Sequence, residues 1–583
     1  MRYSFRKKHA LAMFATLLFL CTMWMLQQEG EISKELSTSS VQELPQGNLM
    51  YPIGEGQYRR EKQQRIVLEQ QEQSYVGPVE RKRGNYKLLP SNPMEVLEHK
   101  PISHQDEKDP PKKKNVHKKV QKLQERKAKA KRAREELSEI PELSPAELEE
   151  FQRRINDYCN PPWEPVDGEE GQVSEEYELH HVHVVARHGD RTPMTKFSLP
   201  DITVDTDFNC DLETAKEQLP SSVLLSRFVA SIMAQDEALP GWPQMPWFLR
   251  TLPIGSHARQ CGPAQLTPTG WLQHMKLGEH MKQAYTSKLV PHRAYFRNPN
   301  MTRFKSTINA RTQQSAFAFM FGFLPRLELR HGEWLKVADN VAFCPSEWNC
   351  SCPAYSQLEE AKQKRYSAVQ KNTTDIQRLL KSVAAVLMKD PKTKSLPGIT
   401  GQQELYSALV CHKKPLPCSP YGCVTQKHLA RIIAYTDRVS RELRSIERGP
   451  HQIFARLNMH PMITEIALQM KKINHGASNY PKFVFYSGHD ITLTPLLDVL
   501  GLGDYHWPGY AANVVFELWS KSGDFFVRVL YNGRDKTNVV RFCWGNLNAD
   551  GLCPLRYLLR FVNRDNMGFF HVDSFGKACR LTF

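Results

Sequence analysis

Residues 181–193 read HVHVVARHGDRTP, an alternating apolar run that leads directly into a polar loop. The run over 181–186 predicts a strand, and open α/β sheets bind their ligands at loops that follow strands. In this loop Arg187 and Arg191 flank His188. Guanidinium groups offer forked donors to phosphate oxygens and keep their charge, and a neutral histidine can attack phosphorus. The stretch predicts an α/β fold with a phosphate site at a strand end.

A second apolar strand is predicted over 483–487, and Gly488, His489 and Asp490 follow it. An aspartic acid in this position could donate the proton that a leaving alcohol needs, and the histidine could add a donor to the phosphoryl oxygens. Gly-His-Asp is a weak signal alone. Together with the first motif it predicts a site for phosphoryl transfer.

The net charge of the chain is concentrated in two places. The 583 residues carry a formal charge of +16, of which residues 108–134 contribute +11 and residues 1–26 contribute +4. The remaining 530 residues therefore carry only +1 (16 − 11 − 4), and we expect no nucleic acid partner. Residues 108–134 are predicted to be a charged spacer, with a site for an acidic polysaccharide or partner as the alternative.

Residues 10–26, ALAMFATLLFLCTMWML, form an uncharged and mostly apolar run after basic residues. As a helix this run is about 25 Å long, at the short end for a membrane span. A cleaved signal peptide is the alternative, but the small residues of a cleavage site are missing. Positive charge before the run predicts that residues 1–9 are a cytosolic tail and that the rest is lumenal. We expect a single-pass type II protein with 10–26 as its signal-anchor, in a thin early-secretory membrane such as the Golgi.

Residues 27–155 are predicted to be a lumenal stalk, largely disordered or helical and basic at 108–134. Prolines interrupt residues 78–111, and few aliphatic residues are available for a core. A capping box from Ser144 to Glu147 predicts a helix that opens the folded region. The folded domain is predicted over 156–583.

The cysteines indicate an oxidising compartment. Of the 13 cysteines, Cys21 lies in the apolar run, which leaves an even number beyond it. A zinc site would need paired C-x-x-C motifs, and the sequence has none. We therefore predict up to six disulfides, whose pairing the sequence does not reveal. Glycosylation sequons at Asn300, Asn349 and Asn372 are compatible with a lumenal location.

The two motifs resemble those of the histidine acid phosphatases, the branch 2 histidine phosphatases. The resemblance covers roughly residues 178–583. Three further segments resemble conserved stretches of that family: LTPTGWLQ at 266–273, STINARTQQSA at 306–316 and GYAANVVFEL at 509–518.

The resemblance implies roles for six residues: His188 and Asp490 as catalytic residues, and Arg187, Arg191, Arg311 and His489 as substrate-binding residues. His188 would be transiently phosphorylated, and Asp490 would protonate the leaving group. No metal or other cofactor is expected. One departure is Lys305, which stands where many members have arginine. It is expected to affect the substrate side rather than the phosphate clamp.

Within this family, the cysteine pattern and the sequence after residue 527 most resemble Golgi members that remove the 2-O-phosphate from xylose in the glycosaminoglycan–protein linkage region. That resemblance implies this substrate and an association with a linkage-region glucuronosyltransferase. Two alternatives remain open. One is a broad acid or inositol-phosphate phosphatase, and the other is a non-catalytic Golgi scaffold that binds glycosaminoglycan.

The expected architecture is an α/β core sheet with strands near 181, 483, 514 and 526. A mostly helical cap insertion, at roughly 197–260 and 330–440, is expected to cover the site. The membrane anchor and stalk would precede this domain.

Overall fold

The computed structural model describes residues 140–583, apart from 165, 195–200, 220–222, 237–247, 249–251, 253–260, 290–299, 339, 346–347 and 389–395. The predicted cytosolic tail, signal-anchor and most of the stalk lie outside these residues. None of the helices within the described ranges combines the length and the apolar character of a membrane span.

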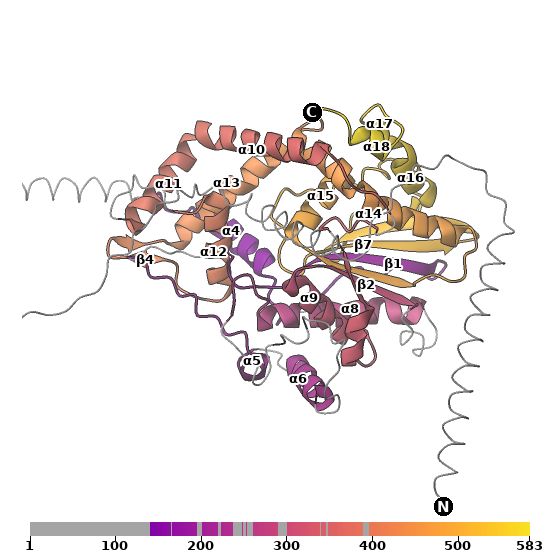
Figure 1. Ribbon diagram of the computed structural model, residues 1–583, viewed down its shortest axis with the longest axis horizontal. Coiled ribbons are helices and arrows are strands. Elements are labelled where there is room, and N and C mark those ends of the chain that lie inside the picture. The colour runs from indigo at the N-terminus through magenta and orange to yellow at the C-terminus, as the bar shows by residue number, and fades with distance from the viewer. Residues whose placement is uncertain are drawn as a thin grey trace, which may run out of the picture. The chain divides into compact units, whose positions relative to one another are not determined.

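A mixed sheet forms the centre of the described domain, with the strand order β10-β8-β7-β1-β6-β2-β3 and β9 paired to β8. Its strands are β1 Glu178–Arg187, β2 Thr302–Thr307, β3 Leu335–Ala338, β6 Phe483–Gly488, β7 Asn513–Lys521, β8 Asp524–Tyr531, β9 Arg534–Asp535 and β10 Cys553–Pro554. The strands β1, β6, β2 and β3 are parallel, whereas β7 is antiparallel to β1. In Figure 1 the purple strand β1 lies among orange strands from the last part of the chain. The four predicted strands are confirmed as β1, β6, β7 and β8.

Side chains of the central strands alternate between two buried faces, as a strand requires. Val184 and Phe485 face one apolar cluster, and Val185 and Val484 face the other. The helices of the first cluster are α5 Leu212–Gln218, α6 Val223–Asp236, α8 Pro268–Leu289 and α9 Ala310–Phe323. Those of the second are α14 Pro450–Asn474, α15 Asp490–Leu500 and α16 Leu555–Arg560. A sheet covered on both faces explains why its central strands are apolar throughout.

A separate group of helices has its own apolar core. It comprises α10 Ala354–Asn372, α11 Thr374–Leu387, α12 Ile399–Cys411 and α13 Gln426–Arg444, which lie together in Figure 1. This group is the cap predicted at 330–440. The other predicted part, 197–260, does not belong to it throughout, because α5 and α6 pack into the cluster on the sheet instead. Helix α6 contacts α8 and α5 contacts α6, which explains the difference.

The remaining short elements of the described chain are the hairpin strands β4 Cys418–Ser419 and β5 Gly422–Cys423, the 3-10 helix Leu329–Trp334, the π-helix Phe561–Asp565, α17 Asn566–Gly568 and α18 Phe575–Ala578. The last elements form a small cluster with residues of α10 and α14.

The predicted capping box is present at the start of α4, Pro145–Cys159. Glu147 N donates to Ser144 Oγ at 3.3 Å, and Ser144 N donates to the Glu147 side chain at 2.9 Å. Phe151 of this helix is buried in the core of the cap. The boundary placed at residue 156 therefore falls inside a packed helix, and the folded domain begins earlier than that, because α4 needs the cap to bury its apolar face.

All twelve cysteines of the described chain form disulfides, which confirms the predicted six bonds. The pairs are Cys159–Cys411, Cys210–Cys261, Cys344–Cys350, Cys352–Cys579, Cys418–Cys423 and Cys543–Cys553. Two of them join distant parts of the sequence. Cys159–Cys411 links α4 to the end of α12, and Cys352–Cys579 links the start of the cap to the last residues of the chain.

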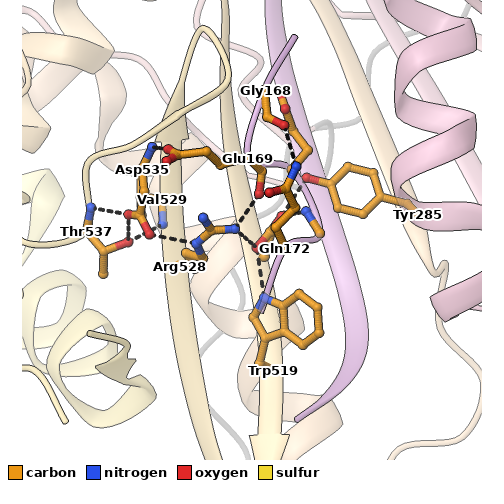
Figure 2. Close-up of polar contacts among 12 residues, drawn as sticks. Gly168, Glu169, Gln172, Tyr285, Trp519, Arg528, Val529, Asp535 and Thr537 are labelled. Carbon is orange, nitrogen blue, oxygen red and sulfur yellow. Dashed lines mark hydrogen bonds and ion pairs between the residues drawn. The ribbon is translucent and has the colours of Figure 1, made fainter. Parts of the chain in front are cut away.

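A buried carboxylate organises the face of the sheet at β7. Glu517 is fully buried and accepts hydrogen bonds from Gly171 N at 2.7 Å, Tyr285 Oη at 2.7 Å and Trp519 Nε1 at 2.8 Å. Arg528 Nη1 adds a fourth donor at 3.3 Å. Figure 2 shows Tyr285, Trp519 and Arg528 converging on this point. Because each carboxylate oxygen is paired, the burial of its charge is compensated.

Arg528 extends this network to the loop before β1. Its Nε donates to Asp535 Oδ2 at 2.7 Å, and its Nη1 donates to the carbonyl oxygen of Glu169 at 2.7 Å (Figure 2). The Glu169 carboxylate in turn accepts from Asp535 N at 2.5 Å. The network connects the loop before β1 to the hairpin formed by β7 and β8. These contacts hold β1 against β7, its neighbour on the side opposite β6.

Candidate active site

The two motifs meet at the carboxyl edge of the parallel strands. The register of β1 and β6 places Arg187 beside Gly488. The neighbouring strand β2 ends at the same edge with Thr307. The ring centres of His188 and His489 lie 5.5 Å apart. His188 and His489, which are 301 positions apart in the sequence (489 − 188), therefore share one site because their strands are adjacent and parallel.

His188 is 1% exposed, and its imidazole has a defined orientation. Its Nδ1 lies 2.8 Å from the carbonyl oxygen of Gly189, which can only accept a hydrogen bond. Nδ1 therefore carries the hydrogen, and Nε2 keeps the lone pair that a nucleophile needs. Burial lowers the pKa of His188 well below its ordinary value, and the charges of Arg311 and Arg187 lower it further. The ring is neutral even in mildly acidic solution.

Close backbone packing holds the loop that carries His188. A Cβ on Gly189 would overlap the backbone of Gly270, and one on Gly270 would overlap the loop, so only glycine fits at both positions. Gly189 N donates to Ser315 Oγ at 3.1 Å, and Asp190 N donates to Gln273 Oε1 at 2.7 Å. Gly270, Gln273 and Ser315 belong to the segments that resemble the family, and in this structure they support the loop.

Arg187 and Arg191 keep buried donors that no group in the described structure satisfies. Arg187 lies 4.4 Å from the ring centre of Tyr510 and donates from Nη1 to the carbonyl oxygen of Pro508 at 2.6 Å. Arg191 donates from Nη1 to Glu404 Oε1 at 2.6 Å. The Nε and Nη2 atoms of Arg187 and the Nε atom of Arg191 have no partner among the described residues. Unpaired buried donors are costly, and a phosphate would satisfy them.

Arg311 lies in the first turn of α9, where the helix dipole favours an anion. Its Nη2 is 3.3 Å from Nδ1 of His489. The other ring nitrogen, Nε2, lies 2.8 Å from Thr307 Oγ1 and 3.2 Å from Asn309 Nδ2, so donor groups face both nitrogens of His489. Burial lowers the pKa of His489 well below its ordinary value, and the arginines add to this effect. His489 is therefore a neutral and oriented group beside His188.

Asp490 is the first residue of α15 and is more exposed than the other five predicted residues. Its Oδ2 accepts a hydrogen bond from Trp507 Nε1 at 2.6 Å. Both residues line a cavity of about 190 Å³ that extends between the cap and the helices α14 and α15. A carboxylic acid in this position can protonate a leaving group that occupies the cavity. Trp507 carries no sequence signal that would have identified it.

Two residues at α12 reach the site and were missed by the sequence analysis. Glu404 pairs with Arg191, and His412 Nε2 lies 2.6 Å from Asp190 Oδ2. The helix reads ITGQQELYSALVC, with one acidic residue and no motif. Only the folded chain, which brings residues about 210 positions apart into contact, reveals these pairs.

Lys305 forms an ion pair within the domain, and its expected effect on the substrate side stays a prediction. Its Nζ donates to both carboxylate oxygens of Glu465 on α14, at 2.7 and 3.0 Å. It also lies 5.2 Å from the ring centre of Tyr486. The departure from arginine is thus accommodated by an ion pair in the body of the domain. In the part of the chain that the structure describes, no three His, Cys, Asp or Glu side chains are grouped as a metal site, and the absence of a cofactor stays a prediction.

Comparison with known proteins agrees with this geometry. The family model of the histidine phosphatase superfamily (branch 2) matches residues 178–532, which include the sheet from β1 to β8, the cap and both motifs. The chain belongs to this family. As a branch 2 histidine phosphatase it is a phosphoric monoester hydrolase.

Several phosphatases of this branch are similar to the chain over most of its length. It is 31% identical over 465 residues to 2-phosphoxylose phosphatase 1 of Danio rerio, covering 74% of this chain and 87% of that protein. Human 2-phosphoxylose phosphatase 1 is 29% identical over 419 residues, covering 70% and 82%. Among solved structures, the multiple inositol polyphosphate phosphatase of Bifidobacterium longum matches with a TM-score of 0.45 and 14% identity, covering 71% of this chain and 98% of that one.

Proposed function

We propose that the protein removes the 2-O-phosphate from xylose in the glycosaminoglycan–protein linkage region, through a phosphohistidine at His188. The similarity to 2-phosphoxylose phosphatases over 70–76% of the chain supports this substrate. The observation that carries the proposal is the cavity beside Asp490, because its shape and charge decide which leaving group can be accepted.

The cavity contains no excess of positive charge. Its lining includes four carboxylates, from Glu359, Asp437, Asp490 and Asp498, against the cations Lys362 and Arg444 and two histidines. Most of these charges are paired within the protein: Arg444 with Asp498 at 2.8 Å, Lys362 with Glu359 at 2.7 Å and Arg154 with Asp437 at 3.0 Å. An inositol polyphosphate would bring further negative charges to these carboxylates. A sugar with neutral hydroxyl groups would meet hydrogen-bonding partners instead.

Several polar atoms in the cavity wall are available for such hydroxyl groups. Gln403 is 4% exposed. Its Oε1, Tyr366 Oη and His451 Nδ1 are buried atoms with no hydrogen-bond partner within the described residues. All three residues line the cavity. Trp507, next to Asp490, offers an apolar ring face of the kind that sugar rings pack against. The lining therefore fits an uncharged polyhydroxy leaving group.

The residues support a two-step displacement. Nε2 of His188 attacks the phosphorus, the bond from phosphorus to the xylose oxygen breaks, and Asp490 gives its proton to that oxygen. Arg187, Arg191 and Arg311 stabilise the charge of the transferred group, with His489 as a further donor. In the second step water attacks the phosphohistidine, Asp490 takes the proton from the water, and phosphate and free His188 are released.

The deciding experiment compares kcat/KM for a xylose-2-phosphate linkage oligosaccharide with kcat/KM for phytate. We expect the oligosaccharide to be preferred, and a preference for phytate would favour the inositol-phosphate alternative. His188→Ala should reduce hydrolysis of any phosphomonoester by a factor of about 10³ or more. A wild-type protein without activity on any of these esters would instead favour the non-catalytic scaffold.

We further propose that the domain lies in the Golgi lumen, anchored by residues 10–26 in type II orientation. The six disulfides support an oxidising lumen. Asn372 is exposed at the end of α10 and offers a test of topology. Treatment of the cellular protein with an N-glycosidase should lower its apparent mass, and Asn372→Gln should reduce that shift. A protein that lacks glycan at every sequon would contradict the lumenal orientation.

The association with a linkage-region glucuronosyltransferase is also a proposal, which follows from the proposed substrate. Co-purification of the two full-length proteins from Golgi membranes should show it, with a Golgi enzyme of an unrelated pathway as the control. Equal recovery of the glucuronosyltransferase and the control enzyme would count against a specific association.

A further inference from the structure

The cap contacts the catalytic loop through charged residues at α12. Glu404 Oε1 accepts hydrogen bonds from Arg191 Nη1 at 2.6 Å and from Met194 N at 3.0 Å. Eight residues further along, at the C-cap of the helix, His412 Nε2 lies 2.6 Å from Asp190 Oδ2. A carboxylate only accepts, so Nε2 donates this hydrogen bond. The loop that follows His188 is thus held from the cap at three residues, Asp190, Arg191 and Met194.

Asp190 is the residue through which this contact can reach the chemistry. It is 1% exposed, and its Oδ2 also accepts a hydrogen bond from Thr267 Oγ1. Its carbonyl oxygen accepts from Thr267 N at 3.0 Å. Gly189, just before it, carries the carbonyl that orients the ring of His188, and Arg191 follows it. A shift of Asp190 would therefore displace the nucleophile and an arginine of the phosphate clamp together.

The surroundings of His412 make its charge sensitive to pH. Burial alone lowers its pKa, but the charge of Asp190 and its hydrogen bond outweigh burial, so the pKa of His412 is raised above its ordinary value. Lys414 lowers it, and that lysine is itself paired with Asp205 at 2.8 Å. The ring of Phe208 packs against the imidazole with centres 4.9 Å apart. The Arg191–Glu404 pair is the other charged group at this contact.

We propose that His412 is a positioning residue for the catalytic loop. In its protonated form it pairs with Asp190 and holds the backbone that carries His188 and Arg191 in the active geometry. When it loses its proton the ion pair is lost, and the buried carboxylate of Asp190 no longer has this counter-charge. The proposal rests on the proposed roles of His188 and Arg191, and it goes beyond them in assigning a second ionisation to the phosphatase.

The sign of the effect follows from the raised pKa. The positioning contact is complete while His412 is protonated, and it weakens as the pH rises through the raised pKa of this histidine. The kcat/KM should therefore fall as the pH rises through this value, even for a substrate whose leaving group needs no proton. This separates His412 from Asp490, which acts on the leaving group.

The test uses 2,4-dinitrophenyl phosphate, whose leaving group needs no protonation, from about pH 6 to about pH 9. His412→Gln keeps a neutral donor toward Asp190 at every pH. We expect its kcat/KM to be lower than that of the wild type by a factor of about 10 to 100 at pH 6, and to approach the wild-type value at pH 9. Substrate ionisation is common to both proteins, so their ratio isolates the histidine.

A second variant tests the charge directly. His412→Lys stays positive over this range, and position 412 is partly open to solvent, with 20% of its side chain exposed. Its kcat/KM should not show the alkaline decline of the wild type. Lys414→Gln removes a neighbouring charge that lowers the pKa of His412 and does not contact Asp190. It is the matched control, and it should keep the wild-type kcat/KM at pH 6 and move the alkaline decline to higher pH.

A constant ratio of His412→Gln to wild type across the pH range would overturn the proposal, because a merely structural residue lowers activity equally at every pH. Wild-type activity of His412→Gln at pH 6 would also overturn it. If His412→Lys does not fold, the His412→Gln ratio alone decides. The proposed role of His188 as the nucleophile is tested separately, and it is contradicted if His188→Ala remains active on this substrate.

Discussion

His188 can act as a nucleophile only if its ring is neutral and one nitrogen is free. The hydrogen bond from Nδ1 to Gly189 leaves Nε2 with its lone pair, and burial among three arginines keeps the ring unprotonated. The same positive charges that disfavour the imidazolium ion are available to bind phosphate. At the scale of single residues, one electrostatic arrangement therefore prepares both the nucleophile and its substrate.

The lowered pKa of His188 predicts the acidic side of the pH profile. A histidine with a depressed pKa stays neutral above that value, so the nucleophile is not lost when the pH falls from about 7 to about 5. Asp490 must carry a proton to serve as an acid, which acidic solution favours. We expect kcat/KM for a sugar phosphate to be highest at mildly acidic pH. A steady rise of kcat/KM from pH 5 to pH 8 would contradict this expectation.

Asp490 is predicted to matter only when the leaving group needs a proton. Asp490→Asn should lower kcat for xylose 2-phosphate by a factor of about 10² to 10⁴, the usual contribution of a general acid. With 2,4-dinitrophenyl phosphate the same variant should retain most of its activity. Rates for both esters, measured on one preparation, check this. Equal losses on the two substrates would show that Asp490 has a different role.

At the scale of secondary structure, the strand ends place the site and the helices hold it. The carboxyl ends of β1, β6 and β2 bring the histidines together, and α8, α9 and α12 support the loop between them. Behind the sheet edge, the Glu517 network fixes β7 and β8 against the entry to β1 (Figure 2). This network lies in the body of the domain and none of its members belongs to the proposed site.

Glu517→Ala is predicted to destabilise the domain without changing its chemistry. It would leave Arg528 and three further donors without their partner, and breaking a buried ion pair costs about 3–5 kcal/mol. The midpoint of urea denaturation should fall, whereas KM of the folded enzyme should stay unchanged. Lys521→Ala, which removes exposed ion pairs with Glu176 and Asp550, is the control and should hardly move the midpoint.

The sequence predicts those site residues that lie together in one continuous motif. Arg187, His188 and Arg191 occur within five residues after an apolar strand, so local pattern alone marks them. The strand β2, TRFKST, has only one large apolar residue and was not predicted as a strand. Pairing with β6 stabilises it, and this pairing is a long-range effect that periodicity does not contain.

The charged contacts of α12 illustrate what the sequence could not reveal. Glu404 is the single acidic residue of the helix and His412 is its C-cap, positions that carry no motif. Their buried partners are Arg191 and Asp190, more than 200 residues earlier. Only the packing of the cap against the loop identifies them. The same holds for Lys305 of β2, whose partner Glu465 lies on α14.

At the scale of the whole molecule, charge separates the chain into parts with different tasks. Residues 108–134 carry +11, while all residues outside them and the first 26 carry +1. The folded domain over 156–583 carries +9, from 49 Lys and Arg against 40 Asp and Glu, spread over far more residues than the +11 of the basic segment. We propose that the basic segment raises the local concentration of long acidic chains near the phosphatase, by steering and by mass action.

Deletion of residues 108–134 tests this idea. KM for a long proteoglycan substrate should rise in the deletion variant, whereas KM for a small phosphoester should not change. Raising the salt concentration should have the same selective effect on the wild type, because screening weakens long-range attraction. The same KM for the long substrate in both proteins would show that the segment is only a spacer.

The position of β1 in the sheet has a consequence for synthesis of the protein. β1 ends at residue 187 and its parallel neighbour β6 begins at residue 483, a separation of 296 residues (483 − 187). At ordinary rates of translation this separation takes about 15 to 60 s, and its other neighbour, β7, comes later still. During that time the strand that leads to His188 has neither of its pairing partners. The active domain therefore cannot form until the last 101 residues, from 483 to 583, are synthesised. Truncation before β6 should yield a substrate for chaperones rather than a smaller enzyme.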